Sequence, residues 1–144
     1  MTLLRATTSV RVPFHDIDIM NIVWHGHYLK YFELARTALV QTIGFDWPEV
    51  KEWGLAMPVV DVSAQYKRPL QYNQEVTLIA ECADPLIPAF DVNYEVRSAD
   101  LSVLHATGRS RQVYIDTSTQ AVAYALPPVV EAKFRAALLQ AAKR

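Results

Sequence analysis

The sequence predicts an α+β domain in which one antiparallel sheet curls around a single long apolar helix. Two observations support this fold: a mostly apolar helical pattern from about His25 to Ile43, and a series of alternating strand patterns after it. No linker, repeat or low-complexity tract divides the 144 residues, a length typical of one domain of ~100–200 residues. We therefore expect a single domain, residues 1–144, in which the sheet and the buried helix cover each other's apolar faces.

The first strand and the long helix follow from local patterns. Residues 8–14 predict a short strand, which should end or lie at a sheet edge because Pro13 cannot donate a ladder hydrogen bond. Gly44 follows the last apolar position of the helix and is a good C-terminal stop. The apolar positions recur at steps of three and four, at Leu29, Phe32, Ala35, Leu39 and Ile43, with Tyr28, Leu34 and Ala38 widening the stripe.

Strands fill most of the remaining chain. Alternation predicts strands at 58–68, 75–82, 90–97 and 103–116, then a short return strand at 121–124 and a C-terminal helix from 127–128 to 142. Gly108 interrupts the longest strand and indicates a bulge or a close backbone approach. In the strand at 58–68, alternation places Val60, Val62, Ala64 and Tyr66 on one face, opposite Asp61, Ser63, Gln65 and Lys67. Because an open sheet leaves unpaired edges, we expect at least a homodimer.

Composition excludes several classes of protein. Hydrophobic residues make up 51% and charged residues 20%, close to globular averages of ~45–50% and ~25%. The net charge of −1 gives no basic field that would favour nucleic acid or a membrane surface. The single cysteine, Cys82, excludes an internal disulfide framework. Without a signal-peptide core or an apolar run of ~18 residues, we expect a cytoplasmic protein with no membrane insertion.

An acidic segment between the first strand and the helix carries the candidate chemistry. Asp16 and Asp18 are two apart, so in extended backbone they would point the same way. The helix opens at His25-Gly26-His27, which places free backbone N–H groups and the positive end of the helix dipole nearby. Such N–H groups can polarise a carbonyl while a carboxylate attacks it or deprotonates water.

Residues 14–37, FHDIDIMNIVWHGHYLKYFELART, resemble the signature of hotdog-fold acyl-CoA thioesterases. The closest resemblance is to the 4-hydroxybenzoyl-CoA thioesterase-like subfamily, which includes the Tol-Pal-associated thioesterases. Tyr66-Lys-Arg-Pro69, followed by Tyr72, is similar to a strand and turn of that family, and the resemblance covers residues 8–116. It implies a hotdog-fold thioester hydrolase without a cofactor or metal, acting on acyl-CoA or acyl-carrier-protein thioesters. It also implies a homodimer or homotetramer with active sites at the dimer interface.

By position, the resemblance assigns the catalytic carboxylate to Asp18, as nucleophile or general base, and the polarising backbone N–H to His25. The family's glycine three residues after the catalytic aspartate is replaced by Asn21, which tolerates left-handed backbone, so the turn can persist. Met20 before it could reshape the acyl pocket. Asp16 is expected to be a turn or cap residue.

Substrate contacts are expected from two groups of residues. Trp24, Met20 and Tyr28 are candidates for the acyl pocket, and equally ordinary core residues. Lys67, Arg68 and Arg109 are candidates for binding CoA phosphates, although strand arginines are often solvated or ion-paired.

Two other functions are compatible with the same residues. One is a metalloenzyme using His15, Asp16, Asp18, His25 and His27, but histidines two apart at a helix start cannot easily aim at one ion. The other is a non-catalytic or dehydratase-type hotdog protein that binds acyl-CoA or acyl-carrier protein, because the fold hosts several functions.

Overall fold

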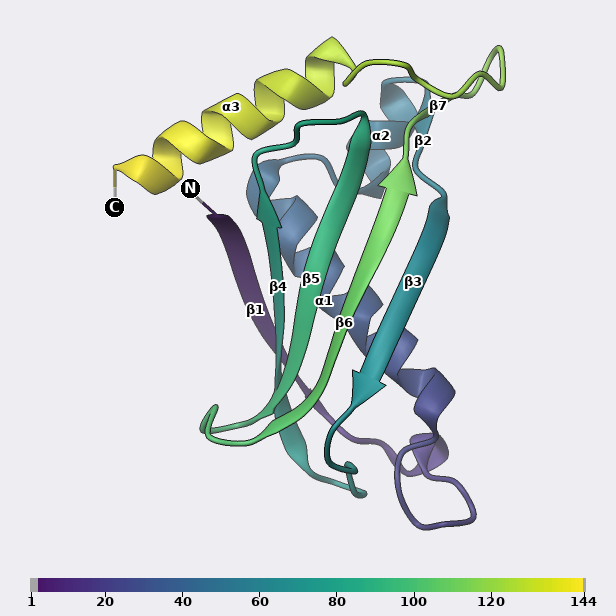
Figure 1. The fold of residues 1–144 in the computed structure, drawn as a ribbon, viewed down its shortest axis with the longest axis vertical. Helices are drawn as coiled ribbons and strands as arrows, with labels where there is room; N and C mark the ends of the chain where they lie inside the picture. Colours follow the sequence, from purple (N-terminus) through teal and green to yellow (C-terminus); the bar gives the residue numbers. More distant parts are fainter. Residues whose placement is uncertain (1–2, 144) are drawn as a thin grey trace.

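The computed structural model describes residues 3–143 and contains one five-stranded antiparallel sheet, in the order β1-β4-β5-β6-β3. The long helix α1 crosses one face of this sheet, and the last turn of the C-terminal helix lies near the start of β1 (Figure 1). The prediction of an α+β hotdog fold is confirmed. The strands are β1 (Leu3–Arg11), β3 (Val59–Tyr66), β4 (Glu75–Ala83), β5 (Ala89–Ser98) and β6 (Leu104–Val113).

Helix α1 (Tyr28–Ile43) continues directly from a 3-10 turn, His25–His27, so the helical segment begins and ends as the pattern predicts. Gly44 adopts a left-handed conformation with φ 98°, and its N–H closes the helix on the carbonyl of Val40. The buried side of the helix includes Tyr31, Phe32, Ala35 and Leu39. Leu29 and Leu34 are exposed instead of buried, because the sheet covers only one side of the helix.

Gly108 of β6 allows the helix to approach the sheet closely. A Cβ atom at this position would lie under 3.0 Å from ring atoms of Phe32. That ring is itself stacked on Tyr94, with centroids 4.7 Å apart and an interplanar angle of 10°. The register of β6 with both neighbours is continuous at Gly108, so close approach, and not a bulge, explains the glycine.

Strand β3 carries apolar side chains that stay exposed in the single chain. Val62, Ala64 and Tyr66 share the helix-side face of the sheet, because they pair with Ser110, Gly108 and Ala106 of β6. Val60, Val62 and Tyr66 are nevertheless 56%, 42% and 48% exposed, because β3 is an edge strand and α1 packs mainly against β1 and β4. The edge beyond β3 is therefore apolar and uncovered in the single chain.

The remaining elements lie at one end of the sheet. Helix α2 (Trp47–Glu52) follows α1 after a short connection, and the side chain of Asp46 caps it by accepting the Trp47 N–H at 2.7 Å. Strands β2 (Leu55–Ala56) and β7 (Ile115–Asp116) form a two-stranded sheet. The expected return strand at 121–124 is reduced to one bridge between Val122 and Ile115.

Helix α3 (Pro128–Ala142) forms where it was predicted and crosses the end of the sheet (Figure 1). Its Phe134 packs against Phe45 and Phe90, with ring centroids 5.4 and 5.9 Å away. In β4, Cys82 is 3% exposed, and burial raises the pKa of its thiol to about 12. No helix in the described part of the chain is long and apolar enough to cross a membrane.

Candidate active site

A tight hairpin, residues 17–23, connects the end of the first strand region to the start of the helix. Ile17 pairs with Val23, the Asp18 N–H donates to the Ile22 carbonyl at 2.9 Å, and the Asn21 N–H donates to the Asp18 carbonyl at 3.0 Å. Asn21 has φ 66°, a left-handed conformation that asparagine adopts more readily than most residues. The expectation that the turn persists with asparagine in place of glycine is confirmed.

Asp18 is half-buried at the base of this hairpin and lines a cavity of about 330 Å³. Its Oδ1 accepts a hydrogen bond from the Met20 N–H at 2.8 Å, which fixes the carboxylate against the turn. No other hydrogen bond or ion pair to this carboxylate occurs among residues 3–143, so its remaining lone pairs are available to a ligand. The cavity is lined by Asp18, Met20, Ile22, Val23, His25, Tyr28, Tyr66, Lys67, Arg68 and Pro69.

The start of the helical segment opens onto the same cavity. Within the described residues, neither the His25 N–H nor the Gly26 N–H donates to a protein acceptor. The His25 carbonyl, in contrast, accepts a hydrogen bond from the Tyr66 hydroxyl at 2.8 Å. This bond ties the helix start to the end of β3. The free N–H groups at the positive end of the helix dipole can therefore donate to a carbonyl oxygen.

Trp24 lies over the helix start and does not line the cavity. A Cβ atom on Gly26 would lie under 3.0 Å from three atoms of the indole, so glycine is needed where Trp24 crosses the backbone. The indole also contacts the rings of His25 and His27, at centroid distances of 5.0 and 5.3 Å. Trp24 thus shapes the His25-Gly26-His27 turn from outside.

Two tyrosines form an aromatic wall of the cavity. The rings of Tyr28 and Tyr66 meet edge to face with centroids 4.9 Å apart. Burial raises the pKa of the Tyr28 hydroxyl above its ordinary value, so it stays protonated at neutral pH. Tyr66 was not among the predicted site residues. Its presence in the Tyr66-Lys-Arg-Pro69 segment was the available signal, but strand alternation assigned it only to the apolar face of its strand.

The basic residues at the end of β3 reach the cavity, whereas the basic residue in β6 does not. The N–H groups of Lys67 and Arg68 both donate to the His105 carbonyl, at 2.8 and 3.0 Å, while their side chains are exposed. Arg109 lies on the exposed face of the sheet, opposite Ser63 and Asn93. The structure therefore brings Lys67 and Arg68, but not Arg109, to the cavity.

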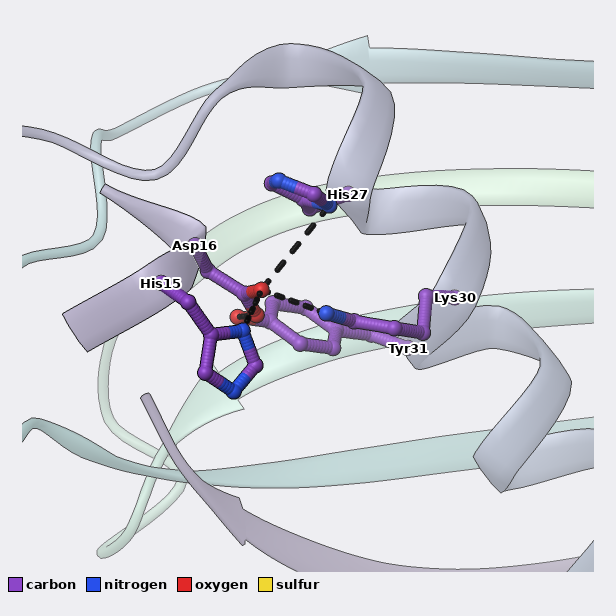
Figure 2. Close-up of polar contacts among 5 residues, drawn as sticks. All are labelled: His15, Asp16, His27, Lys30 and Tyr31. Atoms are coloured by element: carbon purple, nitrogen blue, oxygen red, sulfur yellow. Dashed lines mark hydrogen bonds and ion pairs between the residues drawn. The ribbon is translucent and has the colours of Figure 1, made fainter. Parts of the chain in front are cut away.

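Asp16 is fully buried, which the expectation of a turn or cap residue did not anticipate. Its Oδ2 accepts a hydrogen bond from the Tyr31 hydroxyl at 2.6 Å, and its Oδ1 pairs with Lys30. Figure 2 shows His15 and His27 beside the same carboxylate, with their Nδ1 atoms 3.3 and 3.8 Å from Oδ1. Burial alone would raise the pKa of Asp16, but the bonds and charges of these neighbours outweigh it and lower the pKa.

The histidines and carboxylates of this region separate into two places. Among the described residues, no three His, Cys, Asp or Glu side chains come together in a group that could hold an ion. His15 and His27 instead lie beside Asp16, and His25 lies on the other side of the turn at the cavity. The arrangement offers a carboxylate and a helix start to a carbonyl substrate.

The chain is similar in sequence and fold to several known proteins. "Putative acyl-CoA thioesterase YneP" of Bacillus subtilis is 38% identical over 66 residues, which are 46% of this chain and 48% of that protein. "Putative esterase sll0410" of Synechocystis is 28% identical over 122 residues, or 85% of this chain and 74% of that protein. A DHNA-CoA thioesterase structure from Staphylococcus aureus superposes with TM-score 0.76 at 22% identity, covering 83% of this chain and 80% of that one.

The alignment with YneP spans only about half of that relative's length, so it indicates homology and not a shared activity of the whole protein. The match to a family model is more extensive, because the model of the thioesterase-like superfamily covers residues 12–135. These residues include the hairpin at 17–23, the helix start, the whole sheet beyond β1 and about half of α3. The chain therefore belongs to the thioesterase-like superfamily.

Proposed function

We propose that this protein is a thioesterase that hydrolyses an acyl-CoA or acyl-carrier-protein thioester. The observation that carries the proposal is the cavity shared by the half-buried Asp18 carboxylate and the open helix start at His25. The superfamily match and the name of the YneP relative support the same chemistry. No metal or other cofactor is needed for it.

In the proposed reaction, the thioester carbonyl oxygen accepts the His25 N–H, which stabilises the negative charge that develops on it. Asp18 then acts in one of two ways. As a nucleophile it attacks the carbonyl carbon, expels the CoA thiolate and leaves an acyl-aspartyl anhydride that water hydrolyses. As a general base it takes a proton from water while the water oxygen attacks the carbonyl carbon; the tetrahedral intermediate then breaks its C–S bond, and the departing thiolate takes the proton from Asp18. General-base help is worth ~10²–10⁴ in rate and one oxyanion donor ~10²–10³.

The cavity wall suits an apolar acyl group. Met20, Ile22 and Val23 line one part, and the rings of Tyr28 and Tyr66 line another. The hydroxyl of Tyr66 is already engaged with His25, so the wall presents mostly hydrocarbon and ring surface. We propose an aliphatic or aromatic acyl group in this space, with the CoA phosphates near the exposed side chains of Lys67 and Arg68.

The exposed edge of β3 supports the proposal of a homodimer, or a dimer of dimers. Val59, Val60 and Val62 are at least 42% exposed, and the backbone of an edge strand is free to pair. A second copy of the chain paired there would cover these valines and place its own residues near Tyr66 at the cavity. Light scattering at micromolar concentration tests this assembly, and a monomer would contradict it.

The proposed activity is tested by thiol release from a panel of aliphatic and aromatic acyl-CoAs. We expect the wild type to release thiol, and Asp18→Asn to lose ~10²-fold or more while remaining folded. Asp84→Asn makes the same chemical change at the far end of the sheet, outside the cavity, and should keep full activity. Equal release by Asp18→Asn would refute the role of Asp18. Acyl-CoA binding without release by the wild type would favour the non-catalytic or dehydratase-type alternative.

A further inference from the structure

We propose that Asp16 is a positioning residue, which holds the Asp18 carboxylate and the His25 N–H in the geometry that the reaction requires. The inference rests on the proposed thioesterase function. Asp16 does not line the cavity, so it acts through the hairpin that follows it and the helix that it contacts.

The side chain of Asp16 ties the segment before the hairpin to the first turn of α1. Its two oxygens engage consecutive helix residues, Lys30 and Tyr31, and the Tyr31 hydroxyl lies 2.6 Å from Oδ2 (Figure 2). Both the Asp16 carboxylate and the Tyr31 side chain are buried, at 0% and 1% exposure. A buried carboxylate is costly unless it is fully paired, so this segment has a single stable docking position on the helix.

The backbone of Asp16 reaches the other end of the hairpin. Its carbonyl accepts a hydrogen bond from the Trp24 N–H at 3.0 Å, and the next residue, Ile17, pairs with Val23. Asp18 follows Asp16 by two residues, and His25 follows Trp24 directly. One residue therefore contacts the helix, the start of the hairpin and its end, and both reacting groups are within two residues of those contacts.

Catalysis by a carboxylate and an N–H is sensitive to their separation, because a 1 Å misplacement can cost ~10²-fold in rate. Replacing Asp16 by asparagine keeps the shape but removes the charge that pairs with Lys30. Replacing Tyr31 by phenylalanine removes one donor to Asp16 and leaves the cavity lining untouched. Both changes should loosen the hairpin without altering the surface that binds substrate.

The test compares steady-state kinetics and amide hydrogen exchange of these two variants with those of a matched control. Tyr94→Phe is the control, because it also removes a buried hydroxyl, which is hydrogen-bonded to the Ser110 hydroxyl at 2.6 Å. Neither Tyr94 nor Ser110 lines the cavity. We expect Asp16→Asn to lower kcat at least tenfold and Tyr31→Phe several-fold, with KM within about twofold of wild type. The Trp24 amide hydrogen should exchange faster with solvent in both variants. Tyr94→Phe should keep the wild-type kcat and the wild-type exchange rate of the Trp24 amide.

Two results would overturn the positioning role. One is an Asp16→Asn variant with wild-type kcat. The other is an equal fall of kcat in Tyr94→Phe, which would show that general loosening, and not this tether, controls the rate. A wild type that releases no thiol from any ester is a different outcome, since it refutes the proposed function itself before any variant is compared.

Discussion

Replacing Gly108 by alanine should destabilise the protein, because the added methyl group has no space. It would lie under 3.0 Å from ring atoms of Phe32 and 2.9 Å from the Ser63 carbonyl oxygen, whereas carbon contacts are ordinarily ~3.5–4.0 Å. The Phe32 ring is 3% exposed and already stacked on Tyr94, so it cannot retreat in that direction. Overpacking of this kind costs ~1–3 kcal/mol, against a gain of ~0.5–1 kcal/mol from replacing glycine in a strand.

Because the closest contact would be 2.3 Å, the overpacking cost lies at the upper end of that range, and the net loss of stability is about 2–2.5 kcal/mol. Urea unfolding followed by circular dichroism measures this loss, with the m-value unchanged. A double-mutant cycle identifies the cause, since Phe32→Leu removes part of the ring that the new methyl group meets. The double variant should be more stable than the sum of the single effects by about 1 kcal/mol. The close-approach explanation would be refuted if the free energy of unfolding of Gly108→Ala lay within ~0.5 kcal/mol of the wild-type value, or if the two single effects added strictly in the double variant.

Three further predictions concern the site. Asn21→Gly should keep wild-type stability and thiol release, whereas Asn21→Val should lose ~1–2 kcal/mol in urea unfolding because its φ of 66° disfavours a branched residue. Lys67→Gln combined with Arg68→Gln should raise KM for acyl-CoA but not for the matching pantetheine thioester, and an equal rise for both would exclude phosphate contacts. The lowered pKa of Asp16 stabilises the fold above the ordinary aspartate pKa of ~3.9, and this contribution is lost as pH falls through the lowered value. The stability difference between wild type and Asp16→Asn should therefore be largest at neutral pH and shrink below pH ~4, and a difference that does not depend on pH would contradict it.

The periodic part of the fold could be predicted because each periodic element has a buried face. The apolar spacing from Phe32 to Leu39 and the alternation in β5 both correspond to burial against another layer. Helix α2 could not be found this way, because its six residues are too few to show a period. The exposure of β3 could not be predicted for another reason: alternation indicates which side chains share an apolar face, but it does not say what covers that face.

The site shows a similar division. The motif places Asp18 and His25 a hairpin apart, and the structure brings both to one cavity, while their catalytic roles remain predictions. The buried state of Asp16 was missed because its partners, Lys30 and Tyr31, are 14 and 15 residues away and become neighbours only when the hairpin folds back on the helix. Local spacing carries no information about such a contact.

The buried thiol of Cys82 has a practical consequence for every measurement that detects released CoA with a thiol-reactive dye. With a pKa of about 12, only roughly one in 10⁴ of these thiols is ionised at pH 8, and the side chain is 3% exposed. The folded protein should therefore contribute almost no background signal, even at high enzyme concentration. Because Cys82 is the only cysteine, the rate at which the dye labels the protein itself reports opening of the β4 region, so one reagent can follow both turnover and unfolding.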